Sequence, residues 1–163
     1  TVTLGTFNIA WLGDGENDVL KFTLTSAGND NKTAQLATTT VNLAFSGADM
    51  KLATGADAIT LYQGSTKIAS YTSAGGQASG AYTLTLVNNA ADDIASGGET
   101  YVVKAKLAAT AVDYKVTASV KVNGGAGADD ITWKDNKDGS ATISWIDLGE
   151  GSSTTRIENS IKY

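Results

Sequence analysis

The chain of 163 residues contains no histidine, no cysteine and no proline. Without histidine there is no Ser-His-Asp triad, no imidazole general base and no imidazole metal ligand. Without cysteine there is no thiolate nucleophile, no disulfide and no zinc or iron–sulfur site of the usual kind. Carboxylates, lysine, tyrosine and hydroxyls remain, and the carboxylates are scattered among predicted turns. We therefore predict that the chain is not an enzyme.

Basic residues are also few. Twelve Lys and Arg against 17 Asp and Glu give a net charge of −5. A nucleic-acid module would cluster Lys and Arg, so no nucleic-acid partner is expected. The longest apolar runs are only a few residues, so no membrane insertion is expected either. The chain begins at Thr1 without an initiator methionine, which indicates a removed leader or a piece of a larger polypeptide. Abundant Thr, Ser and Asn with 18% charged residues favour an extracellular or cell-surface location.

Alternation of apolar and polar residues is the dominant pattern. Successive side chains of a strand point to opposite faces, so each alternating segment has one buried and one exposed face. Helix signals are weak, because the alanine-rich segment 105–112 lies within a strand-like run. The alternation is clearest over 20–25, 82–86, 101–107 and 114–122, with shorter copies at 41–45, 59–61, 68–71, 131–133 and 143–145.

Turn signals rich in Gly, Asn and Asp separate these segments, because glycine adopts the positive φ angles that tight connections need. About ten strands joined in this way predict an all-β fold with little helix, an antiparallel β-sandwich of immunoglobulin-like or jelly-roll type. We interpret residues 1–163 as one β-sandwich domain. Residues 128–163 contain a predicted tryptophan-bearing hairpin and a terminal strand, and they are a candidate appendage.

Four strand-and-turn segments carry a resemblance to a known kind of protein. They are Val19-Leu20-Lys21-Phe22-Thr23-Leu24, Ile59-Thr60-Leu61-Tyr62-Gln63-Gly64-Ser65 with Ile68, Ile94 to Ala105, and Asp129-Asp130-Ile131-Thr132-Trp133. Their order resembles the immunoglobulin-like surface modules in large secreted proteins of uncultivated, small-genome bacteria. Those proteins look like S-layer-type or appendage proteins with tandem modules. The resemblance spans about Val19 to Trp145 and implies an extracellular structural role with no catalytic residues, although this chain departs from the family in lacking proline.

The densest acidic cluster precedes the strand at Val19. Asp14, Glu16 and Asp18 alternate in a glycine-bent loop, and calcium prefers oxygen ligands of this kind. The spacing lacks the twelve-residue pattern of a helix–loop–helix site, and a solvated turn explains it more economically. If the cluster does bind a metal, the cofactor expected at Asp14, Glu16 and Asp18 is calcium.

Aromatic side chains offer a second candidate site. Trp11, Trp133 and Trp145 could stack on sugar rings, which would make a polysaccharide a partner. Trp133 and Trp145 share the alternation of Ile131 and Ile143, so packing across a hairpin is the more economical interpretation.

The first segment, Thr1 to Ile9, carries no charge and no proline to block strand pairing. Its apolar residues, Val2, Leu4, Phe7 and Ile9, define a candidate assembly strand. Such a strand adds either to a neighbouring subunit or to its own domain, and the sequence leaves both open.

The leading functional hypothesis is an extracellular structural module that associates with copies of itself or with neighbouring modules in a cell-surface layer or filament, by strand addition. A carbohydrate-binding or adhesin module is the alternative, and a virion or phage fibre domain is the third.

Overall fold

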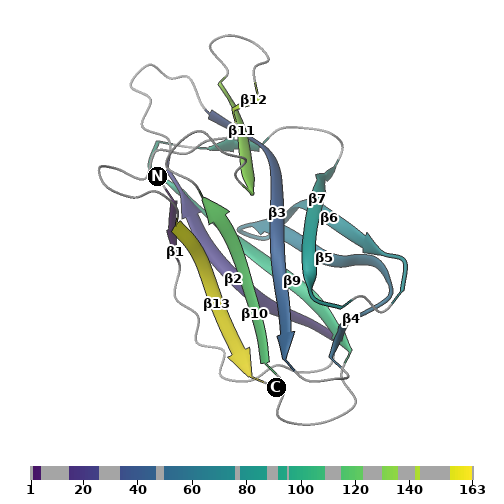
Figure 1. Cartoon of the computed structure of the whole chain (residues 1–163). Coiled ribbons are helices and arrows are strands. Elements are labelled where there is room, and N and C mark those ends of the chain that lie inside the picture. Colours follow the sequence, from purple (N-terminus) through teal and green to yellow (C-terminus); the bar gives the residue numbers. More distant parts are fainter. Residues whose placement is uncertain are drawn as a thin grey trace.

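The computed structural model describes residues 2–4, 15–25, 34–46, 50–75, 78–87, 92–94, 96–108, 115–122, 130–135, 142–143 and 155–162. These residues form thirteen strands, all paired antiparallel, with no α-helix among them (Figure 1). The all-β antiparallel fold with little helix is therefore confirmed. The strands are β1 (Val2–Leu4), β2 (Gly15–Leu24), β3 (Ala34–Ser46), β4 (Lys51–Leu52), β5 (Gly55–Gln63), β6 (Thr66–Ser73), β7 (Gly80–Leu86), β8 (Asp92–Ile94), β9 (Glu99–Ala108), β10 (Lys115–Val122), β11 (Ile131–Asp135), β12 (Thr142–Ile143) and β13 (Thr155–Lys162).

The strands follow one path, in the order β1-β2-β9-β5-β6-β7-β3-β10-β13. The first part of the path forms one layer of the sandwich, and β7, β3, β10 and β13 form the other. Two residue pairs between β6 and β7, Ala69 with Leu86 and Ser70 with Thr85, join the layers. Figure 1 shows β1 beside the start of β13, so the sheet nearly closes on itself.

The core lies between the two layers and follows the predicted alternation. On β9, Tyr101, Val103, Ala105 and Leu107 are buried, whereas Lys104 and Lys106 lie on the outer face. The same holds on β7, where Tyr82 and Leu84 are buried and Thr83 and Thr85 are exposed. The alternation of apolar and polar residues in the sequence therefore identifies the inner face of both strands.

Two strands depart from simple alternation. On β2, Val19 and Leu20 are both fully buried, because a β-bulge shifts the register to β9 between Asp18 and Leu20. On β10, alternation predicts an exposed Ser119, but this residue is only 4% exposed. A single-sequence pattern contains no information about what covers a given face, so this exception was not predictable.

Two hairpins agree with the turn chemistry. β5 and β6 are joined by Gly64 and Ser65, with Gln63 opposite Thr66 and Gly64 at a φ of 58°. The predicted tryptophan hairpin is present as β11 paired with β12, with Trp133 opposite Ile143. In addition, β11 pairs with β3, and β13 pairs with β10 over eight residue pairs. Two of the three strands in segment 128–163, β11 and β13, thus pair with strands of the main sheet, and the assignment of this segment as an appendage stays a prediction.

One core residue carries a polar group without a hydrogen bond. Thr39 on β3 is 1% exposed, and its Oγ1 has no hydrogen-bond partner within the described part of the chain. A buried hydroxyl without a partner costs about 1–3 kcal/mol. We expect Thr39→Val, which keeps the shape and removes the hydroxyl, to raise the free energy of unfolding by about 1 kcal/mol.

Urea denaturation of Thr39→Val measures this gain. The matched control is Thr60→Val, because Thr60 is equally buried but its hydroxyl donates to Glu16 Oε1 over 3.4 Å. The control is expected to lose stability. A loss of stability in both variants would contradict the assignment of an unsatisfied hydroxyl to Thr39.

Candidate functional site

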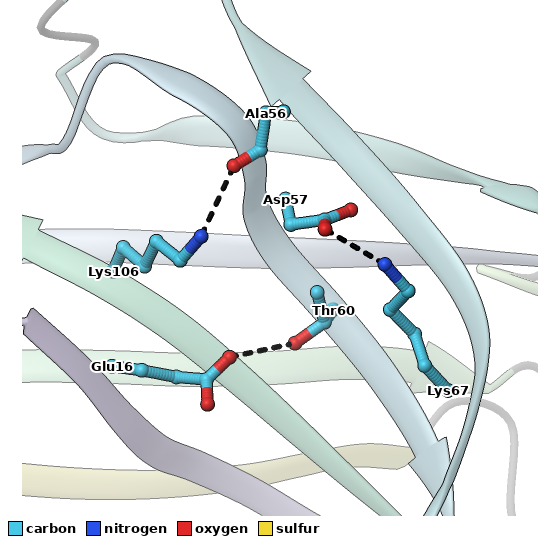
Figure 2. A network of polar contacts seen from close by, with 6 residues as sticks. All are labelled: Glu16, Ala56, Asp57, Thr60, Lys67 and Lys106. Atoms are coloured by element: carbon cyan, nitrogen blue, oxygen red, sulfur yellow. Dashed lines mark hydrogen bonds and ion pairs between the residues drawn. The ribbon is translucent and has the colours of Figure 1, made fainter.

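A network of polar side chains covers the outer face of the layer formed by β2, β9, β5 and β6 (Figure 2). Its residues occupy the positions that alternate with the core residues of the same strands. Thr60 lies at the centre, directly opposite Lys104 on β9 and Ser70 on β6. Three ion pairs lie on this face, between Lys67 and Asp57 and from Lys104 to Glu16 and Asp18, and we therefore treat it as the candidate site.

Lys104 is held by groups from two neighbouring strands. Its Nζ lies 3.5 Å from Asp18 Oδ1 and 3.8 Å from Glu16 Oε2, and it also lies 5.0 Å from the centre of the Tyr62 ring. The lysine side chain is 30% exposed, so each ion pair is screened by water and contributes little, about 0.2–1 kcal/mol. These contacts fix the position of the ammonium group.

The second part of the network stabilises an irregularity in β5. The register to β6 shifts between Gly55 and Ile59, and within this stretch Asp57 has a φ of 54°, a left-handed conformation. Aspartate tolerates this conformation better than most residues. Lys67 Nζ donates to Asp57 Oδ2 over 2.7 Å, and Lys106 Nζ donates to the Ala56 carbonyl over 3.1 Å. Two lysines therefore fix the backbone of the bulge.

The hydrogen bond from Lys67 lowers the pKa of Asp57 below 3.8, and partial burial opposes this shift. The same bond raises the pKa of Lys67 above 10.5. A lowered carboxyl pKa adds stability above the unfolded pKa, and this stability is lost as the pH falls through the folded value. The raised lysine pKa adds stability that is lost only as the pH rises through the folded lysine value.

We expect Asp57→Asn to lower the urea midpoint at pH 7, and we expect this loss to shrink as the pH falls through the lowered pKa of the folded carboxyl. Asparagine also adopts positive φ, so the backbone preference is kept. Lys67→Gln, which removes the partner, should show the same pH dependence. If the two substitutions act additively at pH 7, the carboxylate and the ammonium are not coupled.

The structure places two of the three predicted calcium ligands on this face. Glu16 and Asp18 both contact Lys104, and Asp14 lies outside the described residues. No group of three or more Asp or Glu side chains is arranged to hold a metal ion in the described ranges. Calcium binding at Asp14, Glu16 and Asp18 stays a prediction, and a calcium ion there would compete with the lysine ammonium for both carboxylates.

The candidate assembly strand is described in part. Val2 and Leu4 belong to β1, which pairs with β2 of the same chain, with Val2 opposite Leu24 and Leu4 opposite Phe22. Phe7 and Ile9 lie outside the described residues. In the single chain β1 therefore pairs with its own domain, and its addition to a neighbouring subunit stays a prediction.

Of the three candidate sugar-stacking residues, the described part of the chain includes Trp133 alone. Trp133 on β11 is partly exposed and lies opposite Leu36 of β3. Trp11 and Trp145 lie outside the described residues.

Sequence reasoning missed several residues of the network. Lys104 and Lys106 were assigned only to an exposed face, because their partners are distant in the sequence. Lys104 contacts Glu16 and Asp18 on β2, and Lys106 donates to the carbonyl of Ala56, 50 positions earlier. Asp57 had a local signal, an aspartate two residues after Gly55. A hydrogen bond in the other layer was also missed: Asn42 Nδ2 donates to Asp130 Oδ2 over 2.6 Å, which depends on the pairing of β3 with the start of β11.

No family model, no curated protein and no solved structure matches this chain. The described residues also contain no helix that is long and apolar enough to cross a membrane.

Proposed function

We propose that this chain is a structural module of an extracellular layer or filament, in which it associates with copies of itself or with neighbouring modules. The supporting observation is the position of the sheet edges. The hydrogen-bonded path ends on β1 and on β13, which lie side by side, and in the described part of the chain each is paired along one side, β1 with β2 and β13 with β10 (Figure 1). An edge strand presents backbone groups that can pair with another chain.

The cross-strand contacts on the outer faces support a structural role. Threonine hydroxyls from neighbouring strands lie 3.0 Å apart at Thr40 and Thr83, and 2.6 Å apart at Thr38 and Thr132. Such pairs stabilise a sheet by about 0.2–1 kcal/mol each. The charged groups of the opposite layer are likewise used in contacts within the domain.

β1 is the edge strand best suited to exchange between copies. It is held by three residue pairs, and its residues carry no charge. The ten residues between β1 and β2 have a contour length of at most about 36 Å. Exchange of β1 would keep the same pairs with β2 of a neighbouring copy, a low-cost route to association.

Deletion of residues 1–9 tests this proposal. We expect the full chain to form higher species in native mass spectrometry and assemblies in negative-stain images, and the shortened chain to stay folded but monomeric. Far-UV circular dichroism reports whether the shortened chain folds. If it unfolds, β1 is an intramolecular strand only; if the full chain is monomeric under all conditions, the module does not self-associate.

A carbohydrate-binding or adhesin module is the second candidate, supported by the partly exposed Trp133 on β11. Under this alternative the full chain stays monomeric, and a polysaccharide changes its tryptophan fluorescence.

A further inference from the structure

For most of its length, β7 has a strand partner along one side. Residues 80–84 pair with residues 39–43 of β3, whereas the residue pairs that join β7 to β6 involve only Thr85 and Leu86. Within the described part of the chain, no strand pairs with the outer side of residues 80–84, which we call the β7 edge. Figure 1 shows β7 on the side of the sandwich away from β1 and β13.

Two hydrogen bonds show which way the backbone groups of β3 point. Thr40 N–H donates to the Asp130 carbonyl over 2.6 Å, on the side of β11, and Phe45 N–H donates to Ser79 Oγ over 2.8 Å, on the side of β7. In antiparallel strands, residues directly opposite each other alternate between hydrogen-bonded and non-hydrogen-bonded pairs. The even-numbered residues of β3 from Thr40 onward therefore direct their backbone groups away from β7.

The register transfers this alternation to β7. Thr40 lies opposite Thr83 and Asn42 lies opposite Ala81, so both are non-hydrogen-bonded pairs. Ala81 and Thr83 therefore direct their N–H and C=O groups outward, and both residues are exposed. These backbone groups have no strand partner among the described residues, and they form a template for the addition of another strand.

The β7 edge lacks the features that normally protect a sheet edge. Native proteins block such edges with charged residues, proline or bulges. Residues 68–91 form the longest stretch of the sequence without Asp, Glu, Lys or Arg, and the chain contains no proline. The pairing of β7 with β3 shows no register shift. β13, in contrast, contains Arg156, Glu158 and Lys162.

We propose that the β7 edge pairs antiparallel with the β7 edge of a second copy of this chain, about a two-fold axis at Tyr82. Ala81 of each copy would lie opposite Thr83 of the other, and their outward groups would form four hydrogen bonds. A two-fold axis brings each residue near its own counterpart, so a charged edge would repel itself. The uncharged β7 edge has no such repulsion, which favours a second copy as the partner.

This inference rests on the proposed self-association and adds a second contact to it. Reciprocal exchange of β1 joins two copies at one side of the sandwich, and the β7 contact would join such pairs at the other side (Figure 1). Two different two-fold contacts on each subunit build rings or filaments. The β7 contact is small, so we expect it to join pairs only at high protein concentration.

Hydrogen–deuterium exchange at single-residue resolution tests whether the β7 edge is covered. In the dilute full chain the amides of Ala81 and Thr83 should exchange rapidly, and in the concentrated protein at least tenfold more slowly. The amide of Tyr82 faces β3 and should exchange slowly in both samples. Slow exchange of Ala81 and Thr83 in the dilute protein would show that another segment of the same chain covers the edge, and it would overturn the proposal.

Ala81→Pro removes one outward N–H from each copy and with it two of the four hydrogen bonds. Proline is tolerated where a strand N–H faces outward, so the melting temperature should fall by a few degrees at most. The association of pairs, measured by sedimentation velocity over a range of concentrations, should weaken about tenfold. Ala81→Val keeps the N–H and should associate like the wild type.

Ala81→Lys tests the same edge without removing a backbone group. The two-fold axis would place the two introduced lysines on one face, at positions about 7–8 Å apart. Ala44→Lys is the matched control, because Ala44 is also exposed and lies on the same face, on β3 in the interior of the layer. Only Ala81→Lys should weaken association, and less so near 0.5 M salt. Equal weakening in both variants would reduce the effect to net charge and overturn the proposal.

The concentration series separates this proposal from the one on which it rests. If the wild type forms pairs but nothing larger, or if Ala81→Pro assembles like the wild type, self-association stands and the β7 contact fails. If the wild type is monomeric at every concentration, both fail. If Ala81→Pro is monomeric while the wild type assembles, the β7 edge is the contact between copies and the exchange of β1 fails.

Discussion

Replacing Phe22 with alanine is expected to lower the free energy of unfolding by about 3–5 kcal/mol. Phe22 on β2 is fully buried and lies directly opposite Tyr101 on β9, which is also fully buried. Their rings are stacked, with centroids 5.6 Å apart and planes 19° from parallel. The substitution removes apolar burial and ring contact together and leaves a cavity between the layers. A domain of ordinary stability, about 5–15 kcal/mol, would lose a large part of it.

Equilibrium unfolding in urea measures the loss. Phe22→Leu is the control, because leucine restores most of the volume but not the ring contact, which contributes about 0.5–1.5 kcal/mol. The leucine variant should therefore lie between the wild type and the alanine variant. If the alanine variant loses less than about 1 kcal/mol, the pair is not a central part of the core.

The sequence predicts the faces of the strands well, because burial of one face imposes a two-residue period that can be counted directly. Val103 and Ala105 were assigned inward and Lys104 outward, and the structure confirms all three. Where two adjacent residues are buried, as at Val19 and Leu20, the period fails. A bulge inserts one residue, and its position depends on the partner strand.

The pairing of the strands could not be predicted in the same way. β9 lies between β2 and β5, strands that begin about 84 and 44 positions earlier. The alternation of apolar and polar residues indicates which face of a strand is buried, but it does not identify the strands that pair with it. The contacts of Lys104 with Glu16 and Asp18 follow from this strand order. The acidic cluster was therefore recognised in the sequence as a candidate site, but its basic neighbour was not.

The proposed assembly contacts depend on the same long-range order. β1 and β13 come from the two ends of the sequence, yet both are end strands of one sheet path. The sequence marks residues 1–9 as a candidate edge segment, but the partner strand of β1 becomes visible only from its register with β2.

Replacing Gly98 with alanine is expected to lower the free energy of unfolding by about 2 kcal/mol, of which about 1–2 kcal/mol comes from the backbone alone. Gly98 precedes β9 and has a φ of 83°, which residues with a Cβ rarely adopt. A Cβ at this position would also lie 2.8 Å from Thr25 Oγ1 and 3.3 Å from Thr23 Cγ2. The turn that aligns β9 with the end of β2 would therefore be strained in two ways.

Gly97→Ala is the matched control for Gly98→Ala. A Cβ at Gly97 would meet no atom within 4 Å, and its φ is not in the left-handed range. Because alanine reduces the freedom of the unfolded chain, this variant should be neutral or more stable by up to about 1 kcal/mol. Thermal unfolding should place Gly98→Ala about 4–8 °C below the wild type. Thr25→Ala in the Gly98→Ala background removes the contact at Oγ1 but not the backbone strain, so it should recover only part of the loss. Equal melting temperatures for Gly97→Ala and Gly98→Ala would show that the left-handed conformation of Gly98 is not required for the alignment of β9.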